Sequence, residues 1–120
     1  MDNTPPQNVR KTPICDSHLA LGARMVSFGG WWMPLQFKGI VEENLAVRSG
    51  AGLFDISHMG QLGISGSNAT AFLDHLLPNH IEPLRPGQIL YSPMCNESGG
   101  IIDDLLVFRR DETDYLLVVN

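Results

Sequence analysis

Apolar side chains recur at helical spacing after Ser67. They occupy positions i, i+3, i+4, i+7 and i+8 of one stretch: Ala69, Phe72, Leu73, Leu76 and Leu77. Such a stripe covers one face of a helix, so the pattern predicts an amphipathic helix. Ser67 is a good N-cap and Pro78 cannot continue a helix, which sets the two ends.

Two further helices are expected from the residues at their ends. Thr12-Pro13 suits the start of a helix that ends at Gly22, because proline fits the first helical position and glycine the C-terminal stop. Another helix is predicted over residues 40–49, which carry glutamates in the first turn and Arg48 in the last. This distribution of charge matches the helix dipole.

The remaining apolar runs predict strands bounded by turn residues. The expected extended segments are residues 24–28, 53–64 with an interruption near Gly60, 88–94, 101–108 and 115–119. Residues 29–37 are rich in glycine and aromatic side chains and are expected to form an irregular loop. Asn96–Gly100 predicts a tight hairpin connection. Helices interspersed with strands predict an α+β fold, with a mixed, largely antiparallel sheet and flanking helices.

Composition favours a packed globular domain. Of 120 residues, 43% are hydrophobic and 18% are charged, which argues against disorder. Eight Lys and Arg against thirteen Asp and Glu give a net charge of −5. The chain therefore lacks the basic surface that non-specific binding to nucleic acid or to an anionic membrane requires. Its apolar runs are far shorter than the roughly 20 residues of a membrane span, so no transmembrane helix is expected.

The two ends of the chain predict a mobile arm and an incomplete fold. Residues 1–11 are polar and contain proline, which predicts a flexible N-terminal arm before a domain over residues 12–120. The arm has the features of neither a secretory signal nor a transit peptide, so the cytoplasm is the expected location. The chain stops as soon as its last strand is complete, and we expect the domain to be truncated at its C-terminus.

The most informative stretch for chemistry is residues 101–108. Side chains alternate between the faces of a strand, so each face is apolar apart from one carboxylate, Asp103 on one and Asp104 on the other. This pattern predicts a strand buried on both faces, with at least one carboxylate in need of a partner. One interpretation is that one aspartate caps the hairpin or pairs with Arg109 or Arg110 while the other meets solvent. In the functional interpretation, one aspartate points into a cavity and binds a cationic or NH-bearing ligand.

Histidines and cysteines give weak signals of catalysis or metal binding. His18 lies on the apolar stripe of the first helix and is expected to be a satisfied, partly buried imidazole. His58 is close in sequence to an aspartate and a serine, but a Ser–His dyad requires its members to meet in space. Cys15 and Cys95 have no CxxC spacing, so neither a zinc site nor a disulfide scaffold is predicted.

A series of motifs runs in order through residues 11–120. It includes Lys11-Thr-Pro-Ile14, Gly52-Leu-Phe-Asp-Ile-Ser-His-Met-Gly60, Met94-Cys-Asn-Glu-Ser-Gly-Gly-Ile-Ile-Asp-Asp-Leu106 and Val118-Val-Asn120. This series resembles the N-terminal part of the aminomethyltransferase family, the T-proteins of the glycine cleavage system. The family usually has an acidic residue in place of Ser27 and often one in place of Trp32. Its members are longer, multidomain chains, so the resemblance implies that this chain is a fragment.

The resemblance implies a transferase of one-carbon metabolism and glycine catabolism. In that family an aminomethyl carbon passes from the lipoyl group of the H-protein to tetrahydrofolate. Ammonia is released and 5,10-methylenetetrahydrofolate forms. Tetrahydrofolate is therefore the implied co-substrate and lipoylated H-protein the implied partner, with no metal. The isolated fragment is expected to be inactive and to bind folate weakly or not at all.

The resemblance also assigns roles to residues. The family's important carboxylate is the second aspartate of Gly-Gly-Ile-Ile-Asp-Asp-Leu, which is Asp104, whereas Asp103 is expected to be structural. We favour an orienting and electrostatic role for Asp104, because an ordinary aspartate pKa of roughly 3.9 suits a general base poorly at neutral pH. The residues expected to line the folate site are Met59, Tyr91, Leu106 and Asn120.

Other members of the wider family give alternatives. One is a non-catalytic folate-binding module related to iron–sulfur assembly proteins, against which the intact Asp103-Asp104 pair argues. Another is the folate domain of a flavin-linked enzyme that oxidises dimethylglycine or sarcosine. There the domain follows a long flavoprotein region, whereas here the motifs begin at Lys11. An inactive fragment is the third alternative.

Overall fold

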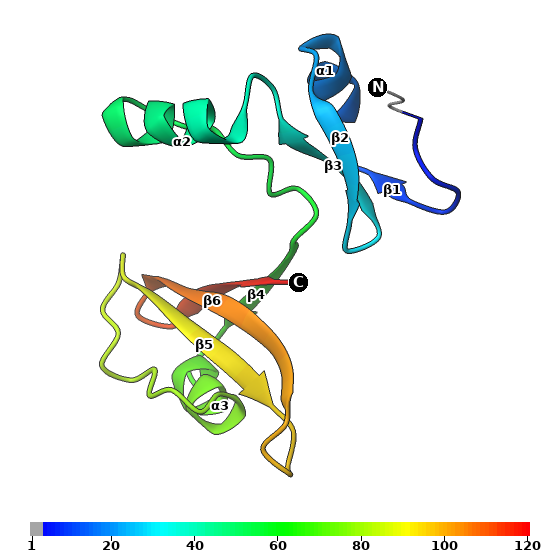
Figure 1. Ribbon diagram of the computed structural model, residues 1–120. Coiled ribbons are helices and arrows are strands. Elements are labelled where there is room, and N and C mark those ends of the chain that lie inside the picture. Colours follow the sequence, from blue (N-terminus) through cyan, green and yellow to red (C-terminus); the bar gives the residue numbers. More distant parts are fainter. Residues whose placement is uncertain (1–3) are drawn as a thin grey trace. The chain divides into compact units, whose positions relative to one another are not determined.

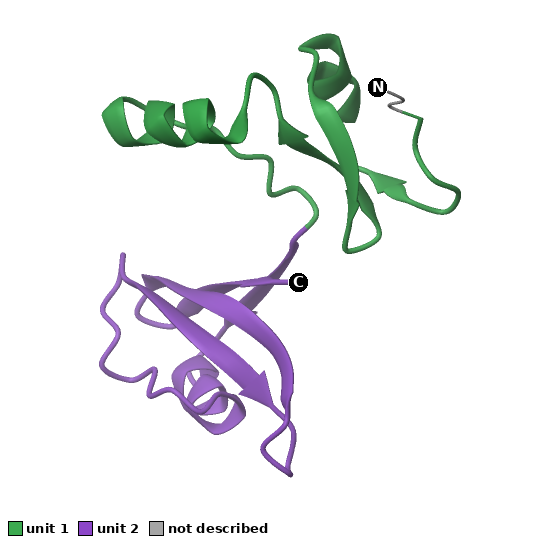
Figure 2. Cartoon of the chain, viewed as in Figure 1, with its two compact units in different colours: residues 1–58 green, residues 59–120 purple. Residues whose placement is uncertain are grey.

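The computed structural model describes residues 4–120 and confirms the α+β class (Figure 1). The chain divides into two compact units, one ending at His58 and one running from Met59 to Asn120 (Figure 2). Part of the predicted mobile arm, residues 1–3, lies outside the described residues. Within the rest of that arm, Arg10–Lys11 forms the short strand β1.

The first unit is built on a small mixed sheet. Its elements are β1, α1 (Cys15–Ala20), β2 (Arg24–Phe28), β3 (Trp31–Gln36) and α2 (Ile40–Ser49). The strand order is β1-β3-β2, with β1 parallel and β2 antiparallel to β3. The buried core of this unit is formed by Cys15, Ala23, Met25 and Trp32.

The predicted irregular loop over residues 29–37 is wrong, because most of it is strand β3. Phe28 pairs with Trp31, so the connection between β2 and β3 is only Gly29-Gly30. Both glycines have positive φ, 54° and 80°, which is the backbone that a two-residue hairpin turn requires. The glycine pair was therefore a hairpin signal.

Helix α2 has the predicted bounds, and a side chain from within it holds the turn that leads into it. One carboxylate oxygen of Glu43, Oε1, accepts the backbone N–H groups of Phe37, Lys38 and Gly39 at 2.7, 2.8 and 3.1 Å. The N–H of Phe37 contributes most to the lowered pKa of Glu43. Burial opposes it, and the N–H groups of Lys38 and Gly39 lower the pKa further. The carboxylate thus satisfies donors that a helix start leaves free.

The second unit is an antiparallel sheet with one helix against it. Its elements are β4 (Gly60–Ser65), α3 (Ala69–Leu76), β5 (Ile89–Cys95), β6 (Ile101–Asp111) and β7 (Asp114–Val119). The strands lie in the order β4-β7-β6-β5. The extended segment predicted over residues 53–64 is wrong for residues 53–59, since strand β4 begins only at Gly60. The turn over residues 96–100 and the meander that follows it are confirmed.

The predicted amphipathic helix is confirmed as α3, which covers one face of this sheet. Its buried residues Ala69 and Leu73 pack with Leu77 into the core of the unit. The sheet and the segment after the helix contribute the rest of that core: Ile81, Leu84, Leu105, Val107, Tyr115 and Leu117. The N-cap is Asn68 rather than Ser67, and Phe72 is 48% exposed.

The prediction that residues 101–108 are buried on both faces is wrong. Leu105 and Val107 are buried on the face toward α3, whereas Ile102 on the other face is 64% exposed. Leu106 and Phe108, which share the face of Ile102, are only half-buried. Within residues 59–120 a single helix covers one face of the sheet, and the opposite face, which we call the open face, is apolar but uncovered.

Candidate functional site

The open face carries most of the residues predicted from the sequence as site residues. Tyr91 on β5 lies directly opposite Leu106 on β6. Asp104 precedes Leu106 by two positions and therefore points to the same face. Val118 pairs with Leu106, so Asn120 lies beside Asp104 at the end of β7. The antiparallel register thus brings Tyr91 and Asn120, which are distant in sequence, to the same cluster as the two β6 residues.

Met59 lies near this cluster but makes no hydrogen bond with it among the described residues. It is half-buried and directly precedes β4. Gly60 pairs with Val119, so Met59 and Asn120 continue outward at the same end of the sheet. A side chain at Gly60 would come within 2.9 Å of the Val119 side chain, which explains why a glycine follows Met59.

Both carboxylate oxygens of Asp104 accept hydrogen bonds from neutral donors. The Tyr91 hydroxyl donates to Oδ2 at 3.2 Å, and the Asn120 amide nitrogen Nδ2 donates to Oδ1 at 3.1 Å. The bond to Asp104 is the main reason that the pKa of Tyr91 is raised, with the Asp104 charge and slight burial adding to it. Asp104 is exposed rather than buried, and within residues 4–120 no cation neutralises its charge.

Asp103 ties Asn120 to the start of β6. Its Oδ1 accepts the Asn120 Nδ2 at 2.7 Å and the Asp104 backbone N–H at 2.9 Å. Its Oδ2 accepts the Asn120 backbone N–H at 3.2 Å. The Asn120 side chain lowers the pKa of Asp103 most, burial opposes this, and the two backbone N–H groups lower it further. Sequence reasoning placed Asp103 in a structural role but did not detect this link to Asn120.

The arginines next to the aspartates do not pair with them, so that part of the interpretation is wrong, whereas the expected solvent-exposed aspartate is found at Asp104. Arg109 donates to the backbone oxygens of Glu82, Leu84 and Glu112 at 3.3, 2.5 and 2.7 Å. Arg110 donates to the Asp114 carboxylate at 2.7 Å. Both guanidinium groups are thus used to hold loops of the second unit.

The hairpin before the site is held by its own side chains. Asn96 Oδ1 accepts the N–H groups of Ser98 and Gly100 at 3.1 and 2.8 Å, and the Ser98 hydroxyl at 2.9 Å. Gly99 has φ 83°, a left-handed conformation that glycine adopts without strain. This turn fixes where β6 begins and thereby the register of Asp103 and Asp104 against β5.

The histidines of the first unit have structural contacts. His18 Nε2 lies 2.8 Å from Asp55 Oδ2, and the His18 ring meets the Phe37 ring edge-on at 5.9 Å. The Asp55 side chain is 1% exposed. These contacts confirm His18 as a satisfied, partly buried imidazole. His58 meets the Phe28 ring edge-on at 5.8 Å.

The His18–Asp55 pair predicts a pH dependence of stability. Burial by itself would raise the pKa of Asp55, but hydrogen bonds from His18 and from the Ser57 N–H hold it well below its usual range. A folded-state pKa below the unfolded value of about 3.9 gives stability that is present above that pH and lost as the pH falls further. We expect Asp55→Asn to remove this slope and to cost about 1–3 kcal/mol at neutral pH.

Tryptophan fluorescence measures this unit alone, because both tryptophans of the chain, Trp31 and Trp32, lie in it. Urea unfolding is followed at several pH values from 7 to about 2.5, a range that extends below the ordinary aspartate pKa of about 3.9. The change of the unfolding free energy with pH gives the slope. Asp16→Asn, which changes an exposed carboxylate of the same unit, is the control. A wild-type slope in Asp55→Asn would refute the assignment.

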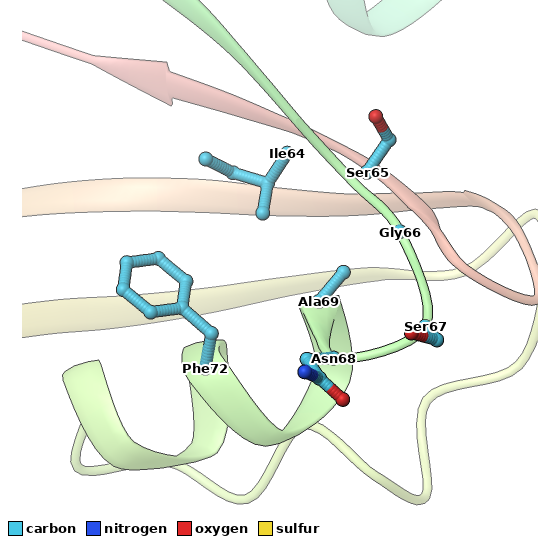
Figure 3. Close-up of a pocket in the computed structure, with 7 residues that line it drawn as sticks. All are labelled: Ile64, Ser65, Gly66, Ser67, Asn68, Ala69 and Phe72. Atoms are coloured by element: carbon cyan, nitrogen blue, oxygen red, sulfur yellow. The ribbon is translucent and has the colours of Figure 1, made fainter.

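The hollows in the surface lie away from the Asp104 cluster. One, of about 330 Å³, opens at the start of α3 (Figure 3). It is lined by Ile64, Ser65, Gly66, Ser67, Asn68, Ala69 and Phe72. Another is lined by apolar residues of β2 and β3. Neither of these two hollows contains a charged side chain or a predicted site residue, and Asp104 itself is exposed.

The described residues offer neither a metal-binding cluster nor a membrane-spanning helix. Residues 4–120 contain no group of three or more His, Cys, Asp or Glu side chains placed to hold a metal ion. In the same part of the chain, no helix has the length and apolar character that crossing a bilayer demands. Cys15 is buried, Cys95 is half-buried, and both are free thiols.

Comparison with known proteins gives consistent matches over nearly the whole chain. The family model described as the GCVT N-terminal domain matches residues 14–120. An aminomethyltransferase of Desulforamulus reducens is 55% identical over 114 residues, which are 95% of this chain and 31% of the relative. An aminomethyltransferase of Deinococcus deserti is 48% identical over 120 residues, 100% of this chain and 34% of the relative.

A solved structure agrees with these matches. The crystal structure of glycine cleavage system aminomethyltransferase T from Bartonella henselae superimposes with a TM-score of 0.86 at 41% sequence identity. The match covers 93% of this chain and 31% of that one. The chain thus spans about a third of the length of these relatives.

Proposed function

Because the chain belongs to the GCVT N-terminal domain family, we propose that it supplies the carboxylate-bearing part of a tetrahydrofolate-dependent aminomethyltransferase. The complete enzyme moves the aminomethyl carbon from the lipoyl group of H-protein to tetrahydrofolate. Ammonia is released and 5,10-methylenetetrahydrofolate forms. Residues 12–120 form part of its folate-binding region, behind an N-terminal arm. We place the enzyme in the cytoplasm, where it works with lipoylated H-protein and without nucleic acid, membrane or metal.

One observation carries this proposal: the Asp104 carboxylate is oriented by neutral donors and is not paired with a cation among the described residues. Tyr91 and Asn120 each bond one of its oxygens, and within residues 4–120 no cation pairs with it. An oriented anion stabilises positive charge that develops beside it. Such charge arises on the aminomethyl carbon and the attached lipoyl sulfur as the carbon–nitrogen bond breaks and ammonia departs. One folate nitrogen then bonds to that carbon, and the carbon–sulfur bond breaks as the second folate nitrogen closes the methylene bridge, which returns the lipoyl thiol.

The open face suits a flat, partly apolar ligand. Tyr91 and Leu106 lie side by side across the strands, and an aromatic ring next to an aliphatic side chain offers a surface on which a pterin can stack. Met59 extends this surface at the end of β4. The Asn120 amide nitrogen is engaged by Asp103 and Asp104, which leaves its side-chain oxygen for an N–H of the ligand.

Asp104 next to the pterin N–H groups would hold the ring in one orientation. When a folate nitrogen is fixed near the reacting carbon, the entropy cost of bringing the two atoms together has already been met on binding. The barrier to the reaction is therefore lower than for a collision in solution. The residues of this chain therefore bind, orient and stabilise charge, and we assign no proton abstraction to Asp104. The proposal of a non-catalytic folate module gains no support from the relatives, which bear the name aminomethyltransferase.

A chimaeric enzyme tests the proposal. Residues 1–120 replace the matching stretch of the Desulforamulus reducens aminomethyltransferase, and formation of methylenetetrahydrofolate from aminomethylated H-protein is measured. We expect activity within about tenfold of the parent, since each tenfold loss corresponds to only about 1.4 kcal/mol of transition-state stabilisation.

The parent with the matching stretch deleted is the control and should be inactive, as should residues 1–120 alone. A chimaera that is folded by circular dichroism, binds tetrahydrofolate and yet forms no product would contradict the proposed function.

A further inference from the structure

We propose that Asp103 is a positioning residue that holds the Asp104 carboxylate in place through Asn120. The inference rests on the proposed role of Asp104 and adds a residue that does not itself touch the folate. It starts from the Asn120 side-chain amide, which lies between two adjacent carboxylates of β6. The Asn120 Nδ2 is 2.7 Å from Asp103 Oδ1 and 3.1 Å from Asp104 Oδ1.

The stronger of these bonds anchors the amide to Asp103. Hydrogen bonds to an ionised acceptor gain strength as they shorten, and the bond to Asp103 is the shorter of the two. Asp103 also accepts the Asn120 backbone N–H at 3.2 Å. Two bonds from one carboxylate therefore fix both the backbone and the side chain of Asn120.

This anchor settles which end of the amide faces Asp104. An asparagine side chain can present either its oxygen or its nitrogen, and the oxygen would be repelled by two carboxylates. Because the nitrogen is held toward Asp103, it is also presented to the Asp104 Oδ1 and to the Asp104 backbone oxygen at 3.0 Å.

Asp104 needs such support because it is exposed. A carboxylate on an open sheet face would otherwise turn about its side-chain bonds. Here Oδ1 is held by Asn120, Oδ2 is held by the Tyr91 hydroxyl, and the Asp104 N–H is held by Asp103 Oδ1. All three donors are neutral, so the arrangement fixes the position of Asp104 without cancelling its charge.

The first test is structural and needs no catalysis. Three-bond couplings about the Asp104 side chain and the two amide-proton signals of Asn120 are measured by nuclear magnetic resonance in residues 1–120. In the wild type we expect couplings typical of a single Asp104 rotamer. In Asp103→Ala we expect couplings averaged over several rotamers. The chemical shifts of the two Asn120 amide protons should also move to those of a solvent-exposed asparagine.

Asp103→Asn keeps one acceptor oxygen, so its couplings and amide shifts should lie between those of the wild type and those of Asp103→Ala. Glu97→Ala, which removes an exposed carboxylate from the neighbouring hairpin, is the matched control and should change neither signal. Wild-type couplings and amide shifts in Asp103→Ala would overturn the inference.

The second test measures coupling to catalysis in the chimaera. Asp103→Ala should lower kcat about tenfold with little change in KM for tetrahydrofolate, because charge is kept and only its placement is lost. In an Asp104→Asn background the same substitution should have no further effect. A tenfold loss that persists in that background would overturn the inference.

The two tests separate this inference from the proposed function. If Asp104→Asn leaves the chimaera fully active, the proposed function of Asp104 fails. The couplings in Asp103→Ala then still decide whether Asp103 positions that side chain.

Discussion

Asp104→Asn in the chimaera is expected to lower the rate of aminomethyl transfer by about 100-fold or more, the size of effect seen when a preorganised electrostatic group is removed. Asparagine has the shape of aspartate and can still bond Tyr91 or Asn120. It lacks the negative charge that stabilises the positive charge on the reacting carbon as ammonia leaves. The loss should therefore appear in kcat, measured as methylenetetrahydrofolate formed per enzyme at saturating tetrahydrofolate.

A nearby carboxylate provides the control. Asp111 lies on the same strand, is exposed, and accepts only the N–H of Glu112 among the described contacts of its side chain. Asp111→Asn removes the same charge from the second unit without touching the cluster and should leave kcat within about twofold, far below the effect of a preorganised charge. Equal losses in the two variants would show that net charge, and not the position of Asp104, matters.

Leu73→Ala is expected to unfold the second unit or bring it close to unfolding. Leu73 is fully buried beneath the sheet, and truncation of a buried leucine costs about 2–5 kcal/mol. A unit of this size rarely has more than about 3–5 kcal/mol of stability from its core. Both tyrosines of the chain, Tyr91 and Tyr115, lie in this unit, so the ring-proton signals of tyrosine in nuclear magnetic resonance measure it selectively.

The preceding residue of the same helix gives a matched control. Phe72 is 48% exposed, so Phe72→Ala removes a larger side chain but much less buried contact. We expect its denaturation midpoint to change less than that of Leu73→Ala. If the two variants lose the same stability, α3 does not hold the sheet through the buried stripe described above.

Local patterns predicted the elements whose signals lie within a few residues. The apolar stripe of α3, the charged ends of α2 and the hairpin at Asn96–Gly100 each depend on contacts between near neighbours, and each was confirmed. Strand β3 was missed although its signal was also local. The pair Gly29-Gly30 supplies the two positive φ angles of a hairpin, but the aromatic residues after it obscured the alternation of a strand.

Contacts between residues far apart in the sequence could not be predicted from local patterns. The apolar residues on both faces of residues 101–108 indicate that each face could be covered by another element. They do not indicate which element covers each face, or whether one is present. In residues 59–120 only α3 is present for that role, so the face of Asp104 stays open. The Asp103–Asn120 link joins residues 17 positions apart. It depends on the register between β6 and β7, which no local pattern specifies.

The most direct test of the central claim separates binding from chemistry at Asp104. Single-turnover transfer by the chimaera is measured with tetrahydrofolate saturating, together with its dissociation constant. The account predicts a rate about 100-fold lower in Asp104→Asn, with a dissociation constant that rises by less than about tenfold, the equivalent of 1.4 kcal/mol. A single-turnover rate within a few-fold of the unmodified chimaera would contradict it.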